Sequence, residues 1–316
     1  MIAALAAAAI AVIIAFVGRP PSEPAGREGR PPLALDAALA QDEHAAALGE
    51  GERLYVEGMA AEALAAFDEI LQRDPDSVAA AVGEAIARWP AGTTARLRTL
   101  ASANPESGLV QLHLGFALFW ERRDTAAVRA WRKAYELEPD TSWALRAENL
   151  LHPTMARGRP IFVSSKELPE ELLEQPLAAQ LAQLEGRARS DGRAQDWVAF
   201  GVALQRAGRP VSARGVFEQA AAISPDDPEA RVAAAIGRFE KDDPAAAFSL
   251  LGPLTTEFPG EPVTRYHLAL ALLWIGGLAE ARTQLEEARG AEGGGFYAEQ
   301  AQRLIEELDR AAADAE

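Results

Sequence analysis

Residues 195–225 read QDWVAFGVALQRAGRPVSARGVFEQAAAISP, and this stretch decides the fold of the chain. Apolar side chains recur at three- and four-residue spacing on both sides of Gly208, which is typical of two amphipathic helices joined by a short turn. Small residues at Gly201 and Ala213 let two antiparallel helices approach closely, and Phe217 fills the space beside that contact. The closing proline ends the second helix. The stretch therefore predicts a helical hairpin.

The same organisation recurs along the chain with a fixed period. Pro105 and Pro139 are 34 residues apart, and so are Pro225 and Pro259, with matching small and large positions between them. A period of this length indicates short helical units that stack on one another to bury their apolar faces. Further copies of the hairpin cover residues 45–75, 109–139, 229–259 and 263–293, and a shortened copy covers 76–105.

The pattern W-x-x-F-G-x-x-L, followed by A-x-x-x-F-x-x-A-x-x-x-x-P, runs from Trp197 to Pro225 and resembles the tetratricopeptide repeat (TPR). The resemblance covers most of residues 44–293 and is to the membrane-anchored bacterial type, because an apolar stretch precedes the repeats. It implies an all-α fold, a right-handed α-solenoid of antiparallel helix pairs. A last amphipathic helix at 296–308 is expected to cap the final repeat.

Composition excludes several classes of function. The 316 residues carry a formal net charge of -16, so the cationic surface that phosphate backbones require is not expected, and nucleic acid is not a predicted partner. The absence of cysteine removes thiolate catalysis, disulfides and thiolate metal sites. With few aromatic residues and many alanines, the chain favours closely packed helices.

The first residues predict a membrane segment. Residues 2–17 contain no charge and no proline, and as a helix they would reach about 24 Å, slightly short of a hydrocarbon core of about 30 Å. Residues 1–18 are interpreted as a transmembrane anchor or an uncleaved signal segment, which places the chain at the cell membrane as a single-pass protein. Residues 19–35, rich in proline and glycine, are expected to be a flexible linker. The side of the membrane stays open, because the few arginines after the segment decide it only weakly.

The repeats are expected to form two blocks, residues 36–152 and 169–293, followed by a capping helix and tail at 294–316. Between them, residues 153–168 lose the helical period. Two interpretations of this insert remain open. It is a surface linker, or Ile161, Phe162 and Val163 form an extended segment that lies against the helices, in or near their groove, because three consecutive apolar residues in a loop seldom stay in water.

Motifs for chemistry are lacking. The four histidines, His44, His113, His152 and His267, lie far apart without ligand spacing, so no metal site is predicted, and partial burial beside aromatic residues is the ordinary explanation for His113 and His267. The glycine clusters follow helices rather than strands, so no cofactor-binding loop is predicted. Acidic pairs such as Asp226 and Asp227 are interpreted as helix caps. The chain is therefore not expected to be an enzyme.

The resemblance implies that the first helix of each pair lines a concave groove. An apolar groove with aromatic anchors suits an amphipathic helix or an extended peptide. The alternative is that the same side chains pack between repeats or under the insert. More polar groove positions include Gln195 and Glu229. The groove residues selected for binding a protein or peptide partner are Leu109, Leu112, Phe116, Phe119, Trp120, Gln205, Arg206, Phe239, Tyr266, Leu270 and Trp274.

These observations predict a membrane-tethered, non-catalytic scaffold or adaptor that binds a protein or peptide partner. The alternative is an assembly factor for an envelope complex, similar to the TPR proteins of cytochrome c maturation, which would require the repeats to lie outside the cytoplasm.

Overall fold

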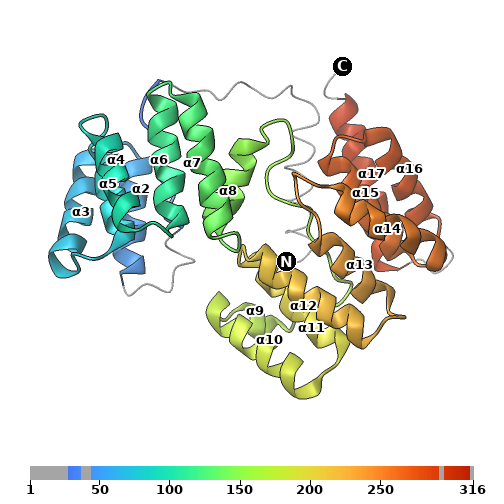
Figure 1. The fold of residues 1–316 in the computed structure, drawn as a ribbon. Helices are drawn as coiled ribbons and strands as arrows, with labels where there is room; N and C mark the ends of the chain where they lie inside the picture. Colours follow the sequence, from blue (N-terminus) through green and yellow to red (C-terminus); the bar gives the residue numbers. More distant parts are fainter. Residues whose placement is uncertain (1–27, 37–43, 292–294, 314–316) are drawn as a thin grey trace. The chain divides into compact units, whose positions relative to one another are not determined.

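The computed structural model describes residues 28–36, 44–291 and 295–313, and the regular elements in these ranges are all α-helices (Figure 1). An all-α fold is thereby confirmed. None of the described helices combines the length and the hydropathy that a membrane crossing needs. The apolar stretch at 2–17 lies outside the described residues. The chain divides into two compact units, here called the N-terminal block, which ends at Leu151, and the C-terminal block, which begins at His152.

The N-terminal block pairs its helices as the proline period predicts. Within each pair the helices pack closely, and the first helices of successive pairs also contact one another, α2 on α4, α4 on α6 and α6 on α8. This contact between alternate helices is the stacking expected of a solenoid. The described helices of this block are α2 (Ala45–Val56), α3 (Ala60–Arg73), α4 (Val78–Ala87), α5 (Thr93–Ala103), α6 (Gly108–Trp120), α7 (Asp124–Leu137) and α8 (Ser142–Leu151).

The C-terminal block repeats this order after two additional helices. Its first helices stack in the same way, α11 on α13, α13 on α15 and α15 on α17. The last helix packs on the final pair, as expected for a cap. The described helices are α9 (Glu170–Leu173), α10 (Leu177–Asp191), α11 (Ala194–Arg206), α12 (Pro210–Ile223), α13 (Pro228–Gly237), α14 (Ala245–Glu257), α15 (Pro262–Trp274), α16 (Leu278–Arg289) and α17 (Phe296–Ala313).

Three hairpins, α2/α3, α6/α7 and α11/α12, each pack a large aromatic ring of the second helix on a glycine of the first. A Cβ atom on Gly51 would lie 2.6 Å from the ring of Phe67, which is fully buried on the partner helix. In the C-terminal block, a Cβ atom on Gly201 would lie 2.3 Å from the ring of Phe217. The ring takes the space that a side chain would need, so the small residue is a steric requirement. This confirms the close approach that the sequence predicts at Gly201.

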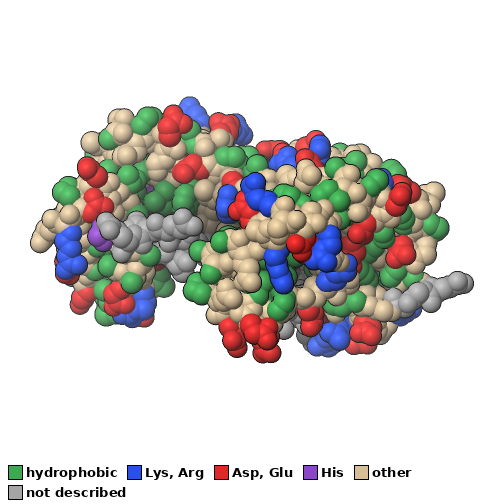
Figure 2. Space-filling model, turned by 90° about the horizontal axis from the view of Figure 1, so that it is seen from below, with side chains coloured by type: hydrophobic (Ala, Val, Ile, Leu, Met, Phe, Trp, Pro, Cys, Tyr) green, Lys and Arg blue, Asp and Glu red, His purple; other side chains and the backbone are tan. Residues whose placement is uncertain are grey.

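Charged side chains of both signs are interspersed over the visible surface (Figure 2). Several of them join neighbouring helices. Arg231 on α13 donates two hydrogen bonds of 3.0 Å to Glu257 on α14. Asp227 accepts hydrogen bonds from the backbone N–H groups of Glu229 and Ala230. The helix cap predicted for Asp227 is thus confirmed.

Candidate functional site: two grooves, each holding an extended segment

The N-terminal block contains a non-helical segment that crosses its first helices. Leu33, Ala34 and Leu35 are 6%, 3% and 3% exposed, and the two leucines belong to the hydrophobic core of the block. The expectation of a flexible linker at 19–35 is therefore wrong for these residues. The reason is that the helices of the block bury these three successive apolar side chains, and this burial stabilises one position of the segment. Residues 29–36 are called the N-terminal strap.

Side chains of the helices bind the backbone of this strap. Tyr55 on α2 donates a hydrogen bond of 2.6 Å to the carbonyl oxygen of Pro31. The backbone N–H of Leu35 donates to Glu52, also on α2, over 3.0 Å. These contacts satisfy buried backbone groups of a segment that has no neighbouring strand. The helices therefore hold the strap as they would hold a peptide.

The centre of the strap is bound by His113 on α6. The backbone N–H of Ala34 lies 3.1 Å from Nε2 of His113, and Nδ1 of the same ring lies 2.8 Å from the carbonyl oxygen of Leu109. A neutral imidazole with its proton on Nδ1 satisfies both contacts, because Nδ1–H donates and Nε2 accepts. Burial lowers the pKa of His113 to about 4, which keeps the ring in this neutral form.

The end of the strap is bound by α8. Asp36 accepts a hydrogen bond of 2.5 Å from the hydroxyl of Ser142 and one of 2.8 Å from the guanidinium of Arg146. Burial opposes ionisation of this carboxyl, but the hydrogen bonds from Arg146 and Ser142 hold the pKa of Asp36 below its usual value. The strap thus touches α2, α6 and α8, all of which are first helices of their pairs or the closing helix.

The insert of the C-terminal block has the same arrangement, and the structure decides between its two interpretations. Phe162 and Val163 are 1% and 5% exposed. The Phe162 ring stacks on His267 with centroids 4.7 Å apart and meets the edge of Phe217 at 5.8 Å. The insert is therefore not a surface linker at these residues but an extended segment in the groove. Residues 158–165 are called the C-terminal strap.

His267 on α15 makes the contacts in this block that His113 makes in the N-terminal block. The backbone N–H of Val163 lies 3.0 Å from Nε2 of His267, whose Nδ1 lies 2.9 Å from the carbonyl oxygen of Val263. Burial lowers the pKa of His267 to about 4 as well. The backbone N–H of Phe162 donates to Gln205 on α11 over 3.2 Å. The grooves of the two blocks thus bind their straps through matching helices.

A polar cluster binds the far end of this strap. Tyr297 on α17 accepts a hydrogen bond from the backbone N–H of Ser165 over 3.0 Å, and its hydroxyl lies 2.9 Å from both the carbonyl oxygen of Val163 and a carboxylate oxygen of Glu229. The hydroxyl of Ser165 also donates to Glu229. Burial first, and the neighbouring Glu229 carboxylate second, raise the pKa of Tyr297, which stays a protonated hydroxyl.

The structure places the predicted groove residues in two groups. Two of them bind the strap directly, Gln205 through the backbone of Phe162 and Trp274 through a 3.3 Å hydrogen bond from its Nε1 to the carbonyl oxygen of Gly158. Of the polar positions, Glu229 does so as well, because it accepts a hydrogen bond from Ser165, whereas Gln195 accepts one of 3.1 Å from Lys166, the residue after the strap.

The other predicted residues are covered rather than open. Arg206 is half-buried and donates to Gln180 on α10 over 3.3 Å. Phe119 and Trp120 are half-buried and pack against the N-terminal core, with their rings 5.7 Å apart. The remaining apolar positions are buried within the two cores, namely Leu109, Leu112, Phe116, Phe239, Tyr266 and Leu270. The reason is that the straps supply the apolar cover that an exposed groove would lack.

Sequence reasoning missed the two histidines and the tyrosines that bind the straps. His113 and His267 were interpreted as ordinary half-buried residues, whereas both are fully buried and accept a backbone N–H from their strap. One signal was available. Both straps begin with Gly-Arg-Pro, at residues 29–31 and 158–160, and differ from the other copies of this tripeptide, at 18–20 and 208–210, in having a large apolar residue two places after the proline.

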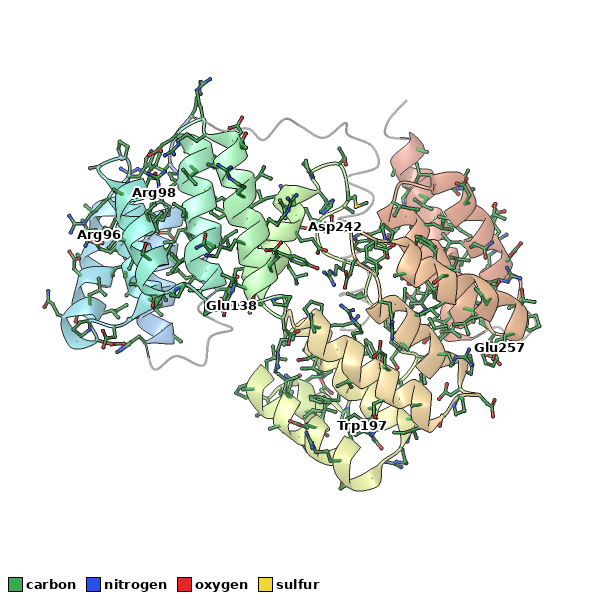
Figure 3. The ribbon with its side chains drawn as sticks, viewed as in Figure 1. Arg96, Arg98, Glu138, Trp197, Asp242 and Glu257 are labelled. Carbon is green, nitrogen blue, oxygen red and sulfur yellow. The ribbon has the colours of Figure 1, made fainter. Side chains whose placement is uncertain are left out.

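The described residues hold no cluster of three or more His, Asp or Glu side chains arranged for a metal ion. Nε2 of His152 lies 3.1 Å from a carboxylate oxygen of Asp242, whose side chain is mostly exposed (Figure 3). His113, His267 and Tyr297 are buried and bond the backbone of the straps, so the arrangement is one for binding an extended backbone.

No family model and no curated protein matches the sequence. Solved structures with similar helical arrangements include a tetratricopeptide repeat protein from Parabacteroides merdae, with a TM-score of 0.35 and 10% identity over 83% of this chain and 97% of that one. Yeast Tom70 aligns with a TM-score of 0.35 and 12% identity over 97% of this chain and 69% of that one. The TPR2AB domain of yeast Sti1, in a complex with pHSP90, gives a TM-score of 0.32 and 12% identity over 84% and 97%. Scores this low carry no inference about function, which rests on the contacts within the chain.

Proposed function

We propose that this chain is a non-catalytic scaffold that binds an extended segment of a partner protein in the grooves of its helical blocks. The observation that carries the proposal is that both grooves already bind an extended segment of this chain by hydrogen bonds to its backbone. Backbone hydrogen bonds give affinity for an extended peptide of varied sequence, and the apolar lining adds the energy of burial.

The scaffold binds without chemical conversion under this proposal. His113 and His267, which would be the natural acid–base groups, each use both ring nitrogens in hydrogen bonds within the groove. Burial keeps both rings neutral at pH 7. A general acid or base needs access to a reacting group, which these rings lack while the groove is filled.

Photo-cross-linking in cells tests the proposal with the full chain. A photoreactive residue is placed at Gln195, which is exposed and bonds Lys166 beside the C-terminal strap, and a control is placed at Gln219, an exposed residue of α12. We expect Gln195 to cross-link to one defined stretch of a partner, identified by mass spectrometry, and Gln219 to give no such product. Cross-links from Gln195 that reach only the chain's own residues would contradict the proposal.

We further propose that residues 1–18 tether the scaffold to the cell membrane. The support is the uncharged apolar run at 2–17, whose length approaches that of a bilayer core. Deletion of residues 1–27 leaves both straps intact and should move the protein from the membrane fraction to the soluble fraction with unchanged helicity. A truncated protein that stays in the membrane fraction would contradict the proposal that residues 1–18 are the membrane tether.

A further inference from the structure

The two straps are copies of one sequence pattern. Residues 29–36 read GRPPLALD, and residues 158–165 read GRPIFVSS. The glycine that opens each pattern has a positive φ, 85° at Gly29 and 83° at Gly158, a backbone conformation that residues with a side chain rarely adopt. The common features are Gly-Arg-Pro, then apolar residues, then an oxygen-bearing side chain at the eighth position.

Matching positions of the pattern meet matching positions of the helices. The sixth residue, Ala34 or Val163, donates its backbone N–H to a histidine on the first helix of the third pair. The eighth residue, Asp36 or Ser165, bonds the closing helix, α8 or α17. This register is the same in both blocks although the side chains differ.

The first helices also bond the straps, from equivalent helix positions but at different residues of the pattern. Tyr55 follows Gly51 by four residues, and Gln205 follows Gly201 by four residues, so the two side chains hold equivalent places on α2 and α11. Tyr55 bonds the third residue of its strap and Gln205 the fifth. Both hydrogen bonds join a helix side chain to the strap backbone, so they depend on the path of the backbone and not on the side chains of the strap.

The fifth residue of the pattern is the position at which a large apolar side chain is required. Leu33 and Phe162 occupy this position, and both are buried in the core of their block. The fourth residue is less restricted, since Pro32 is exposed and Ile161 is half-buried. A ligand for these grooves thus needs a large apolar side chain two places after the proline.

We infer that both grooves recognise one class of ligand, an extended segment of the pattern Gly-Arg-Pro-x-apolar-x-x-Ser/Asp, and that residues 29–36 and 158–165 are resident copies which a partner's segment of this pattern replaces. The inference rests on the proposed function and narrows it to a ligand chemistry. A resident segment acts at an effective concentration on the order of millimolar, so a partner's segment binds well only where the resident contact is weakened or its own affinity is higher.

A peptide of residues 155–168, MARGRPIFVSSKEL, and the full chain carrying Phe162→Ala provide the test. The substitution weakens the resident strap, and the peptide supplies the missing ring. We expect the labelled peptide to bind the variant at least tenfold more tightly than the wild-type chain, as measured by fluorescence anisotropy. The same peptide with alanine in place of its phenylalanine should lose that advantage.

Two peptide controls distinguish specific recognition of the pattern from nonspecific apolar binding. Methylation of the backbone nitrogen matched to Val163 removes the hydrogen that His267 accepts and should weaken binding about tenfold or more. Methylation at the residue matched to Ser164, whose amide donates no hydrogen bond to the described residues, should change it less than threefold. Equal effects of the two methyl groups would overturn the inferred register.

A cross-block peptide tests the shared pattern itself. A peptide carrying GRPPLALD, from the N-terminal strap, should also bind the Phe162→Ala chain, though more weakly, because leucine fills less of the space left by the ring. No binding of this peptide, when the 155–168 peptide does bind, would overturn the inference of one ligand class. It would leave the proposed scaffold function standing, because cross-linking from Gln195 detects a partner of any sequence.

If Phe162→Ala unfolds the block, the strap can be freed without substitution. Cleavage sites for a specific protease are introduced after Thr154 and after Leu168 in the full chain, and the protein is cut in its folded state. The released strap should then exchange with the labelled 155–168 peptide, and unlabelled GRPPLALD peptide should compete. A cut strap that never exchanges, in a block that stays folded, would show it to be a permanent part of the core and would overturn replacement by a partner.

Discussion

The two blocks share the way they bind a strap and differ in how they fill the space around it. In the N-terminal block the strap presents Leu33, and in the C-terminal block it presents Phe162 stacked on a histidine. The strap ends differ too, since Asp36 meets a half-exposed arginine while Ser165 meets a buried tyrosine hydroxyl. Both nevertheless give a central backbone N–H to a buried histidine. The comparison teaches that the grooves fix the path of an extended chain and tolerate variation in its side chains.

The largest expected effect comes from emptying the apolar position of a strap. Phe162→Ala should destabilise the C-terminal block by about 3–5 kcal/mol, and Leu33→Ala should destabilise the N-terminal block by about 2–4 kcal/mol, because each leaves a cavity in a core. Hydrogen exchange with mass spectrometry at increasing urea resolves the two blocks. A change below about 1 kcal/mol in either variant would mean that the strap is not packed as described.

The two histidines predict a pH dependence of similar size in both blocks. Their pKa is about 4 in the folded chain and near 6.5 when unfolded, so below pH 6.5 the unfolded state takes up protons first. The stabilisation is fully present above pH 6.5 and is lost as the pH falls toward 4, by about 3 kcal/mol per block. Urea unfolding between pH 7 and 4.5 measures it. A flat profile in one block would break the equivalence of the two histidines.

Removing the acceptor tests that equivalence directly. His113→Leu and His267→Leu should each destabilise their own block by about 1–3 kcal/mol, because a buried backbone N–H loses its partner. Each variant should also lose most of the pH dependence of its block between pH 6.5 and 4. Unfolding curves that retain the wild-type pH dependence would assign it to other groups.

The glycines under the aromatic rings should respond alike. Gly51→Ala and Gly201→Ala should each cost about 1–3 kcal/mol, because the new methyl group overlaps the ring of Phe67 or Phe217. Gly186→Ala is the matched control, since a Cβ atom there has no neighbour within 4 Å, and its helix should gain about 0.5–1 kcal/mol. Thermal unfolding of the three variants provides the comparison. A stabilised Gly201→Ala chain would contradict the close contact.

The smallest effect is expected at the end of the N-terminal strap. Asp36→Asn should cost about 1 kcal/mol or less, because Arg146 is half-exposed and its ion pair is screened by water. Tyr297→Phe, the matching change in the C-terminal block, should cost more, about 1–3 kcal/mol, because it leaves the backbone N–H of Ser165 without its acceptor. Urea unfolding measures both losses of stability. A larger loss for Asp36→Asn than for Tyr297→Phe would contradict the contacts described at the two strap ends.

The helical framework was predictable because its signals are local. Proline spacing and the alternation of small and large residues place the hairpins, so the pair at residues 195–225 appears as α11 and α12 within a few residues. The solenoid stacking follows from units too small to bury their own faces. The two compact units divide between Leu151 and His152, and the insert was predicted to begin at residue 153.

The straps were harder to predict because an extended segment has no period of its own. Residues 33–35 differ little in composition from an apolar turn within a linker, and only the groove opposite them makes burial favourable. The role of His113 depends on an amide 79 residues earlier in the chain, a relation that spacing does not reveal. Polar groove positions such as Gln205 were predictable, because their place on the first helix fixes the direction they face.

Hydrogen exchange of single backbone amides, followed by NMR, tests the central claim most directly. The amides of Ala34 and Val163 should exchange as slowly as those in the middle of α6 and α15, because each is buried and bonded to a histidine. Exchange of both amides at the rate of an unstructured peptide would contradict the account, since the straps would then lie outside the grooves.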